Sequence, residues 1–267
     1  MTTIYLAHMW GSGLVTDDRC PKIGVLASYA NERAQGRATV QDWNFMLQQS
    51  HLRGLAVDSG AYSFLKEPEP VDVNEYADFI DRRGLASNPL VDMVFSLDVI
   101  GDWRASQRNT IALNARGLKV VPTWHAGSPL DVLRGMARDY PRIAIGGVAR
   151  MKGEERRRVI AKAFSAVWPT RIHGFGIHSP ALLDEFPFDS VDATSAWQEV
   201  TFQGRVAMAT GGLGSEKLDV SVRGTYPRVR IPSGESRLPM TVIARNILNM
   251  EHRCAMRWGR ELARWRS

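Results

Sequence analysis

The chain has 267 residues, 44% of them hydrophobic, and a formal net charge of +6, which suits one large α/β barrel, a domain that ordinarily takes roughly 200–250 residues. It has no run of about 18 apolar residues and no secretory-signal pattern, so we expect a cytoplasmic protein of a bacterial or phage-infected cell with no membrane partner. Its two cysteines, Cys20 and Cys254, make neither a disulfide framework nor a metal-ligand cluster, so we expect ordinary thiols, no metal and no cofactor.

Hydrophobic patterning predicts strands that mostly alternate with helices. The predicted strands cover residues 4–8, 23–28, 55–58, 91–98, 119–123, 142–145, 171–176 and 188–192. The predicted helices cover residues 39–49, 71–83, 103–116, 130–139, 154–167 and 180–185. Alternation implies parallel strands with crossover connections. The sequence therefore predicts an eight-stranded β/α barrel of the TIM type over residues 1–204.

The rhythm breaks after Asp192, and residues 205–267 are predicted to form a basic extension packed on the barrel. It contains a β-like stretch at 226–232 and a final helix over 239–265. Twelve of its residues are Lys or Arg and five are Asp or Glu, whereas the other 204 residues are nearly neutral. A basic appendage indicates a polyanionic partner such as DNA, although a solvated basic helix is the simpler alternative. The expected phosphate contacts are Arg223, Arg228, Arg230 and Arg245.

Polar residues gather where the predicted strands end. In β/α barrels the reactive groups come from the C-terminal ends of the strands. The residues at or just past such ends are Asp58, Asp98, His125, Gly146, Gly147, His178 and Asp192. We therefore expect them at one mouth of the barrel. Each carboxylate taken alone is equally well explained as a helix cap or an ion-pair partner.

Two or three carboxylates at one mouth suit cleavage of a glycosidic bond. One can attack or stabilise the anomeric carbon, while another moves a proton to or from the leaving group. A third can accept hydrogen bonds from a nucleobase. The glycines at 146 and 147 allow close approach of a flat ligand or simply make a tight turn. Aromatic residues that flank the strands can stack on a base or pack in the core: Tyr62, Trp124, Phe175 and Trp197.

Five segments, in the same order along the chain, resemble tRNA-guanine transglycosylases. Residues 58–63 (Asp-Ser-Gly-Ala-Tyr-Ser) resemble the family's Asp-Ser-Gly-Gly-Phe-Gln, and 95–98 (Phe-Ser-Leu-Asp) its Ala-Phe-Asp. Residues 144–149 (Ala-Ile-Gly-Gly-Val-Ala) are close to its Ala-Ile-Gly-Gly-Leu-Ala, and 174–180 resemble its Met-Gly-Val-Gly-Thr-Pro turn. Residues 188–192 (Phe-Asp-Ser-Val-Asp) align with its Ile-Asp-Met-Phe-Asp.

The resemblance implies a role for each matching residue. Asp192 would be the nucleophile toward C1′, with Asp189 as the fallback in another register, and Asp58 the general acid and base. Asp98 would read the base edge, helped by a base pocket formed from the remaining members of these motifs. The expected base-binding residues are Ser59, Gly60, Tyr62, His125, Gly146 and Gly147, with His178 and Trp197 as further candidates.

The departures from the family point to one branch of it. The Cys-x-Cys-x-x-Cys cluster of its zinc subdomain is missing, His125 replaces a Gln, and Ala-Thr-Ser-Ala-Trp at 193–197 replaces Pro-Thr-Arg. With the shorter chain, these features are similar to the DpdA-type DNA deazapurine transglycosylases of phages and bacterial modification islands. That branch implies DNA and a free deazapurine base as partners, with the target nucleotide flipped out of the duplex.

Three functions stay open at this point. The enzyme could exchange a base for a 7-deazaguanine derivative, or act as a hydrolytic DNA glycosylase that leaves an abasic site in defence or repair, since the same carboxylates serve both reactions. A non-catalytic nucleic-acid-binding barrel would use its carboxylates only as helix caps. A barrel acting on a small phosphorylated metabolite is disfavoured, because an acidic mouth repels phosphate.

Overall fold

The computed structural model describes residues 2–7, 21–33, 43, 47, 52–64, 71–177, 179–193, 205–207, 215–217 and 237–263. Its centre is an eight-stranded sheet whose neighbouring strands pair in parallel. The strands are β1 (Thr3–Ala7), β2 (Gly24–Ser28), β3 (Gly54–Asp58), β4 (Val91–Val94), β5 (Thr123–His125), β6 (Arg142–Gly146), β7 (Arg171–Gly174) and β8 (Ser190–Ala193). Their order in the sheet is β4-β3-β2-β1-β8-β7-β6-β5.

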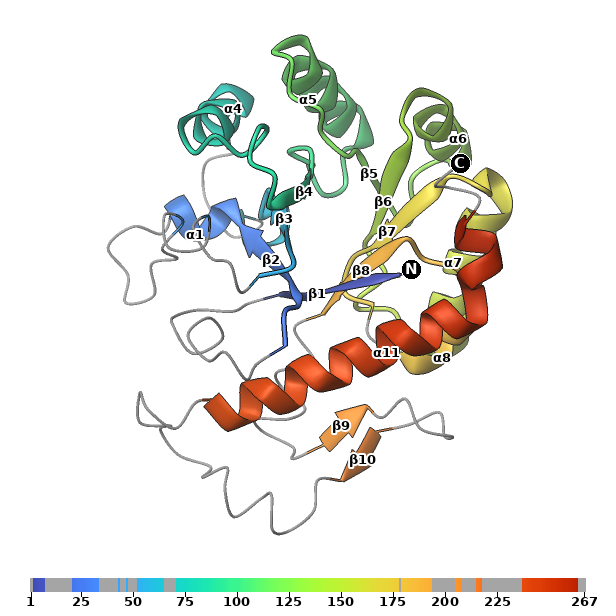
Figure 1. The fold of residues 1–267 in the computed structure, drawn as a ribbon. Coiled ribbons are helices and arrows are strands. Elements are labelled where there is room, and N and C mark those ends of the chain that lie inside the picture. Colours follow the sequence, from blue (N-terminus) through green and yellow to red (C-terminus); the bar gives the residue numbers. More distant parts are fainter. Residues whose placement is uncertain are drawn as a thin grey trace.

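The two outer strands meet through a single bridge. Phe95, just after β4, pairs in parallel with Val121, just before β5. The Val121 N–H donates to the Val94 carbonyl at 2.8 Å, and the Ser96 N–H donates to the Val121 carbonyl at 2.9 Å. These bonds join the ends of the curled sheet (Figure 1). The predicted α/β barrel of the TIM type is confirmed.

Helices lie between the strands on the outside of the sheet (Figure 1). They are α1 (Tyr29–Arg33), α3 (Ala61–Phe64), α4 (Val73–Arg82), α5 (Trp103–Ala115), α6 (Leu130–Asp139), α7 (Gly153–Val167) and α8 (Pro180–Glu185). The long helix α11 (Arg237–Ala263) follows a short antiparallel pair, β9 (Arg205–Ala207) and β10 (Ser215–Lys217). In the part of the chain described, no helix is long and apolar enough to cross a membrane.

Several predicted elements differ from the structure, and the strands predicted over 91–98 and 171–176 end at Val94 and Gly174. The fifth strand was predicted over 119–123, but the ladder with β6 begins only at Thr123, because Pro122 has no N–H to donate and Val121 pairs instead with the end of β4. The short helices α1 and α3 were not predicted. Of the helix predicted over 39–49, only positions 43 and 47 are described, and both are helical. The stretch 226–232 lies outside the described residues.

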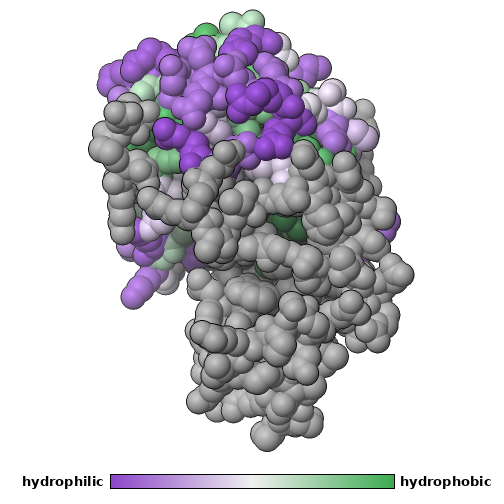
Figure 2. Space-filling model, turned by 90° about the vertical axis from the view of Figure 1, so that its left-hand side faces the viewer, coloured by the Kyte–Doolittle hydropathy of each residue, from purple (hydrophilic) through white to green (hydrophobic). Residues whose placement is uncertain are grey.

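Side chains from each strand alternate between two hydrophobic layers. Ile4 and Leu6 of β1 pack against the surrounding helices, whereas Tyr5 and Ala7 point into the barrel. The buried residues inside the barrel are Tyr5, Ala7, Leu26, Ala56, Met93, Phe95, Val121 and Ala144. The barrel interior is therefore a packed core beneath its mouth. On the outside, Figure 2 shows hydrophilic side chains over the described upper part of one face.

Polar side chains fill the N-terminal end of the barrel. The Tyr5 hydroxyl donates to Asp92 at 2.8 Å, and Gly54 makes room for this carboxylate, because a Cβ at position 54 would lie 1.8 Å from Asp92 Oδ2. Asp189 pairs with Arg142 at 2.7 Å and with Arg171 at 3.0 Å. These contacts close the end opposite to the expected site.

Helix α11 is fixed to the barrel by buried polar contacts as well as apolar ones. Ala244, Ile247, Met250 and Cys254 of this helix are buried. The Glu251 carboxylate, 1% exposed, accepts the Ile4 N–H at 2.8 Å and an Arg53 N–H at 2.6 Å. The Trp258 indole donates to the α8 carbonyl of Leu183 at 2.7 Å. Helix α11 thus lies against β1 and α8.

Replacing Glu251 with Ala should lower the free energy of unfolding by about 2–4 kcal/mol, because it leaves the buried Ile4 N–H and the Arg53 guanidinium without this acceptor. Chemical denaturation measures the loss. The neighbouring exposed residue offers a control, since His252→Gln should change stability by less than about 0.5 kcal/mol. Equal stability of Glu251→Ala and wild type would show that the contact does not fix α11.

Candidate active site

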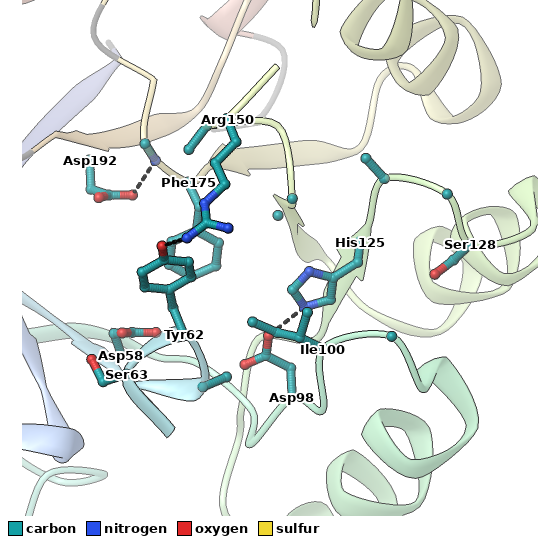
Figure 3. A pocket seen from close by; sticks show the side chains of 18 of the residues that line it. Asp58, Tyr62, Ser63, Asp98, Ile100, His125, Ser128, Arg150, Phe175 and Asp192 are labelled. Atoms are coloured by element: carbon teal, nitrogen blue, oxygen red, sulfur yellow. Dashed lines mark hydrogen bonds and ion pairs between the residues drawn. The ribbon is translucent and has the colours of Figure 1, made fainter. Parts of the chain in front are cut away.

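A cavity of about 840 Å³ opens at the C-terminal ends of the strands. Residues from the ends of β3, β4, β5, β6 and β8 line it, as the sequence predicts. The expected residues that face this cavity are Asp58, Tyr62, Asp98, His125, Gly146, Gly147 and Asp192. Figure 3 shows the three carboxylates around one space, together with Phe175. The structure therefore brings together side chains that are up to 134 positions apart in the chain.

Asp58 is the last residue of β3 and is held by a tight turn. The Gly60 N–H donates to Asp58 Oδ2 at 3.1 Å. Gly60 has φ of +81°, which L residues rarely adopt, and a Cβ there would lie 2.5 Å from the Ala30 Cβ. Glycine at this position therefore permits both the turn and the close packing of α1 against it.

Burial, together with the negative charges of Asp98 and Asp192, raises the pKa of Asp58 to about 7. Hydrogen bonds from the Gly60 N–H and the Ser28 hydroxyl act in the opposite direction. A carboxyl group with a pKa near 7 can both donate and accept a proton at neutral pH. Asp58 thus has the property required of a general acid and base.

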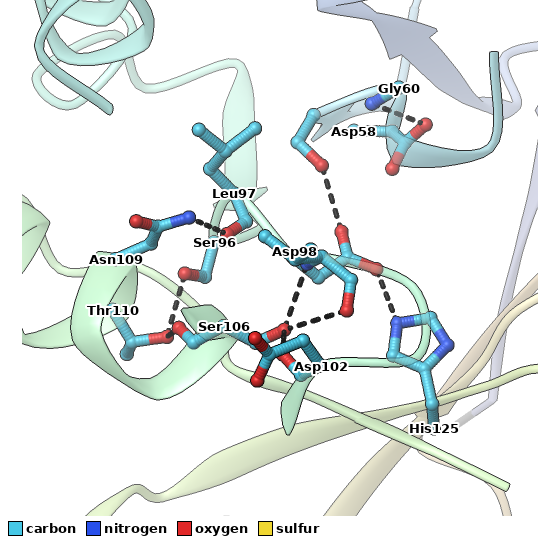
Figure 4. Close-up of polar contacts among 12 residues, drawn as sticks. Asp58, Gly60, Ser96, Leu97, Asp98, Asp102, Ser106, Asn109, Thr110 and His125 are labelled. Carbon is cyan, nitrogen blue, oxygen red and sulfur yellow. Dashed lines mark hydrogen bonds and ion pairs between the residues drawn. The ribbon is translucent and has the colours of Figure 1, made fainter. Parts of the chain in front are cut away.

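Asp98 is held between two neighbours. The Ser59 hydroxyl donates to Asp98 Oδ1 at 2.9 Å, and His125 Nε2 hydrogen-bonds Asp98 Oδ2 (Figure 4). Their side chains are largely buried, at 9% exposure for Asp98 and 15% for His125. The pair presents one face of a carboxylate and an imidazole ring to the cavity.

The loop that carries Asp98 is braced against α5 by side chains (Figure 4). The Asn109 amide donates to the Leu97 carbonyl at 2.9 Å, and the Ser96 and Thr110 hydroxyls lie 2.7 Å apart. The Ser106 hydroxyl accepts the Val99 N–H at 2.8 Å. These bonds on both sides of Asp98 fix its position before any ligand binds.

Asp192 enters the cavity from β8. Its Oδ1 accepts the Gly176 N–H at 3.0 Å. Gly176 has φ of +65°, and a Cβ there would lie 2.7 Å from the Ala149 Cβ. The turn after β7 therefore needs glycine, and this turn delivers a backbone donor to Asp192.

An aromatic and cationic pair covers one side of the cavity. Tyr62, on α3, is 59% exposed, and the Arg150 guanidinium lies 4.9 Å from the centre of its ring. Arg150 also hydrogen-bonds the Tyr62 hydroxyl (Figure 3). Phe175 lies deeper and packs against Phe95 with ring centres 4.6 Å apart. Two apolar ring surfaces are thus available to a flat ligand.

The glycines at the end of β6 make room for protein as well as for the cavity. A Cβ at Gly146 would lie 3.0 Å from the His125 ring, so glycine there lets His125 sit against β6. Gly147 has φ of +77° and lines the cavity. The space beside Gly146, where we expected a ligand to approach the backbone, is thus occupied by the imidazole of His125.

Several expected residues lie elsewhere. Ser59 and Gly60 do not line the cavity and act on it through Asp98 and Asp58. Asp189 is paired with two arginines at the opposite end of the barrel, so its position does not support the fallback assignment. Trp124 is buried in the outer core. The following lie outside the residues or side chains that the structure describes: His178, Trp197, Arg223, Arg228, Arg230 and Arg245.

Two cavity residues that contact the expected ones were missed from the sequence. Ser28 ends β2 and hydrogen-bonds Asp58, and the position rule for strand ends could have found it. Arg150 lies four residues after the end of β6. At that distance from a strand end, the sequence does not predict which way a side chain points. Among the described residues, no group of three or more His, Cys, Asp or Glu side chains is arranged to hold a metal ion.

No family model and no curated protein matches the chain. Solved structures of the carboxyl transferase domain of Rhizobium etli pyruvate carboxylase do. The structure with 3-bromopyruvate is 14% identical to this chain and has a TM-score of 0.46. The match covers 96% of this chain and 48% of the solved chain. The structure with pyruvate is 14% identical and has a TM-score of 0.44. That match covers 98% of this chain and 48% of the solved chain. This chain thus spans about half the length of those it matches, and a likeness at this level bears on neither activity nor substrate.

Substituting Asp58 with Asn should stabilise the protein increasingly from about pH 4 to about pH 7. The raised pKa means that the unfolded chain loses the Asp58 proton at lower pH than the folded chain does, so wild-type stability falls through this window and then levels off. Chemical denaturation at several pH values measures the difference. Asp131→Asn, at a side chain 90% exposed, should show no such growing gain. A pH-independent difference for Asp58→Asn would contradict the raised pKa.

Proposed function

We propose that this protein is an enzyme that acts on the N-glycosidic bond of a flipped-out nucleotide in DNA, and that it exchanges the base for a 7-deazaguanine derivative. The observation that carries the proposal is the convergence of Asp58, Asp98 and Asp192 on one cavity. Helix caps and surface ion pairs, the simpler explanation of each aspartate, do not predict such convergence. Among the described residues, neither Asp58 nor Asp192 forms an ion pair with Arg or Lys.

The chemistry divides between two of the carboxylates. Asp192 attacks C1′ of the nucleotide as the base departs, and Asp58 donates a proton to the leaving base. In the second half, a ring nitrogen of the incoming base attacks C1′, the bond from C1′ to Asp192 breaks, and Asp58 accepts the proton that this nitrogen loses. A pKa of about 7 for Asp58 suits both steps, because a group that both donates and accepts a proton works best when its pKa lies near the ambient pH.

The remaining residues suit recognition of a base. Asp98 uses two lone-pair sites for Ser59 and His125 and keeps others for ring N–H or exocyclic amine donors. Tyr62 and Phe175 offer ring surfaces for stacking. The resemblance of these segments to the base pocket of tRNA-guanine transglycosylases supports the same assignment.

The cavity also has one feature suited to a nucleic-acid backbone. Of the described residues, Arg150 is the one Lys or Arg that lines it. Three carboxylates would repel a phosphate deep in the cavity, so an arginine beside the exposed Tyr62 suits a phosphate held at the mouth while the base lies inside. Phosphate contacts from the basic residues 205–267 stay a prediction.

The Asp192→Asn variant tests the proposal. DNA with unmodified or modified bases is incubated with wild type or variant, with and without a free labelled deazapurine. Wild type should incorporate the label, and the variant should lose at least about 10³-fold of this activity, since it lacks the nucleophile, while binding DNA as before. Label incorporation and alkali-labile strand breaks are the readouts.

Asp139→Asn, an exposed change at the end of α6, is the matched control and should keep full activity. Alkali-labile breaks without incorporation would show a hydrolytic DNA glycosylase that uses the same residues. DNA binding that survives loss of all three aspartates, with no base ever released by wild type, would instead show a non-catalytic binding barrel. Full turnover by Asp192→Asn would remove Asp192 from the mechanism.

A further inference from the structure

A histidine lies directly beneath the cavity and is not accounted for by the proposed chemistry. His173 is in β7, is 0% exposed and does not line the cavity. Its ring packs against both Phe95 and Phe175, with ring centres 4.7 and 4.8 Å away. An imidazole in such an apolar layer is unusual unless its nitrogens have polar partners.

The two ring nitrogens of His173 face different groups of β8. Parallel pairing places His173 opposite Ser190, and alternation along the strand turns Ser190 and Asp192 to the same interior side. Nδ1 lies 2.9 Å from the Ser190 hydroxyl. Nε2 lies 3.4 Å from Asp192 Oδ1 and makes no hydrogen bond within the described part of the chain. The ring thus connects Ser190 to Asp192.

The surroundings favour one tautomer. A hydroxyl can donate or accept, so Ser190 is compatible with either form of Nδ1. A carboxylate only accepts, so a lone pair on Nε2 would repel Asp192, whereas an Nε2–H would attract it. The arrangement therefore favours a proton on Nε2, with the Ser190 hydroxyl donating to Nδ1.

We propose that His173 is a positioning residue for Asp192: oriented by Ser190, it directs its Nε2–H at Oδ1 of Asp192 and leaves Oδ2 to react. The Gly176 N–H donates to the same Oδ1 at 3.0 Å, so both groups face one oxygen of the carboxylate. The free oxygen then points at the substrate in one orientation. The catalytic part of this assignment rests on the proposed function, whereas the contact itself does not.

Nitrogen NMR of the intact, ¹⁵N-histidine-labelled protein tests the contact without any activity. His173→Gln identifies the His173 signals by their loss. The expected spectrum has a protonated Nε2 and an unprotonated Nδ1. A protonated Nδ1 with a bare Nε2 would overturn the proposal, because the ring would then repel the oxygen that it is said to hold.

Kinetics test the consequence for Asp192. His173→Leu should lower kcat at least about tenfold with little change in KM, since partners that orient a reacting side chain act on the chemical step. His173→Gln, whose amide can place an N–H near the Nε2 position, should recover part of the loss. Val121→Ala, which opens space in the same barrel interior, should leave kcat unchanged.

The outcomes separate the two claims. The positioning role would be overturned if His173→Leu kept the kcat of wild type. It would also be overturned if His173→Gln had no higher kcat than His173→Leu. Absence of glycosidic activity in wild type, together with the expected tautomer, would overturn the proposed function alone. A protein that fails to fold with Leu at 173 leaves the NMR result on wild type to decide.

Discussion

The site is built around three carboxylates that the fold holds close together in one cavity. Asp58, Asp98 and Asp192 come from strands that the curled sheet brings to a single mouth. Burial and the charges of Asp98 and Asp192 raise the pKa of Asp58 to about 7. Such a cluster opposes folding, so the scaffold must compensate for it. An arrangement that is costly for stability and useful for proton transfer is typical of an active site.

The compensation comes from donors placed by the backbone. Each carboxylate receives at least one hydrogen bond from the protein: Asp58 from Gly60, Asp98 from Ser59 and Asp192 from Gly176. Two of these donors are glycine N–H groups at positive φ, so the turns after β3 and β7 serve both the fold and the site. The closed polar end of the barrel and the buried Glu251 contact hold the opposite side rigid.

The barrel and the three carboxylates could be predicted from the sequence because both follow from local patterns. Buried strands alternate with helices, and in such barrels the C-terminal ends of the strands, where these carboxylates stand, surround the mouth. The start of β5 could not be predicted, since pairing across the closing edge of the sheet sets it. Nor could the contacts of Ser28 and His173, which depend on neighbours that only the closed barrel supplies. Asp189 and Asp192 look alike in sequence, yet the register of β8 places them at opposite ends of the barrel.

The most direct test of the account is a crystal structure of the protein soaked with 7-deazaguanine. The base should occupy the cavity, with its N–H edge at Asp98, a ring face against Tyr62 or Phe175, and the nitrogen that would carry the sugar directed toward Asp58 and Asp192. A base bound outside this cavity, or inside it with that nitrogen turned away from both carboxylates, would contradict the claim that these aspartates act on a nucleoside.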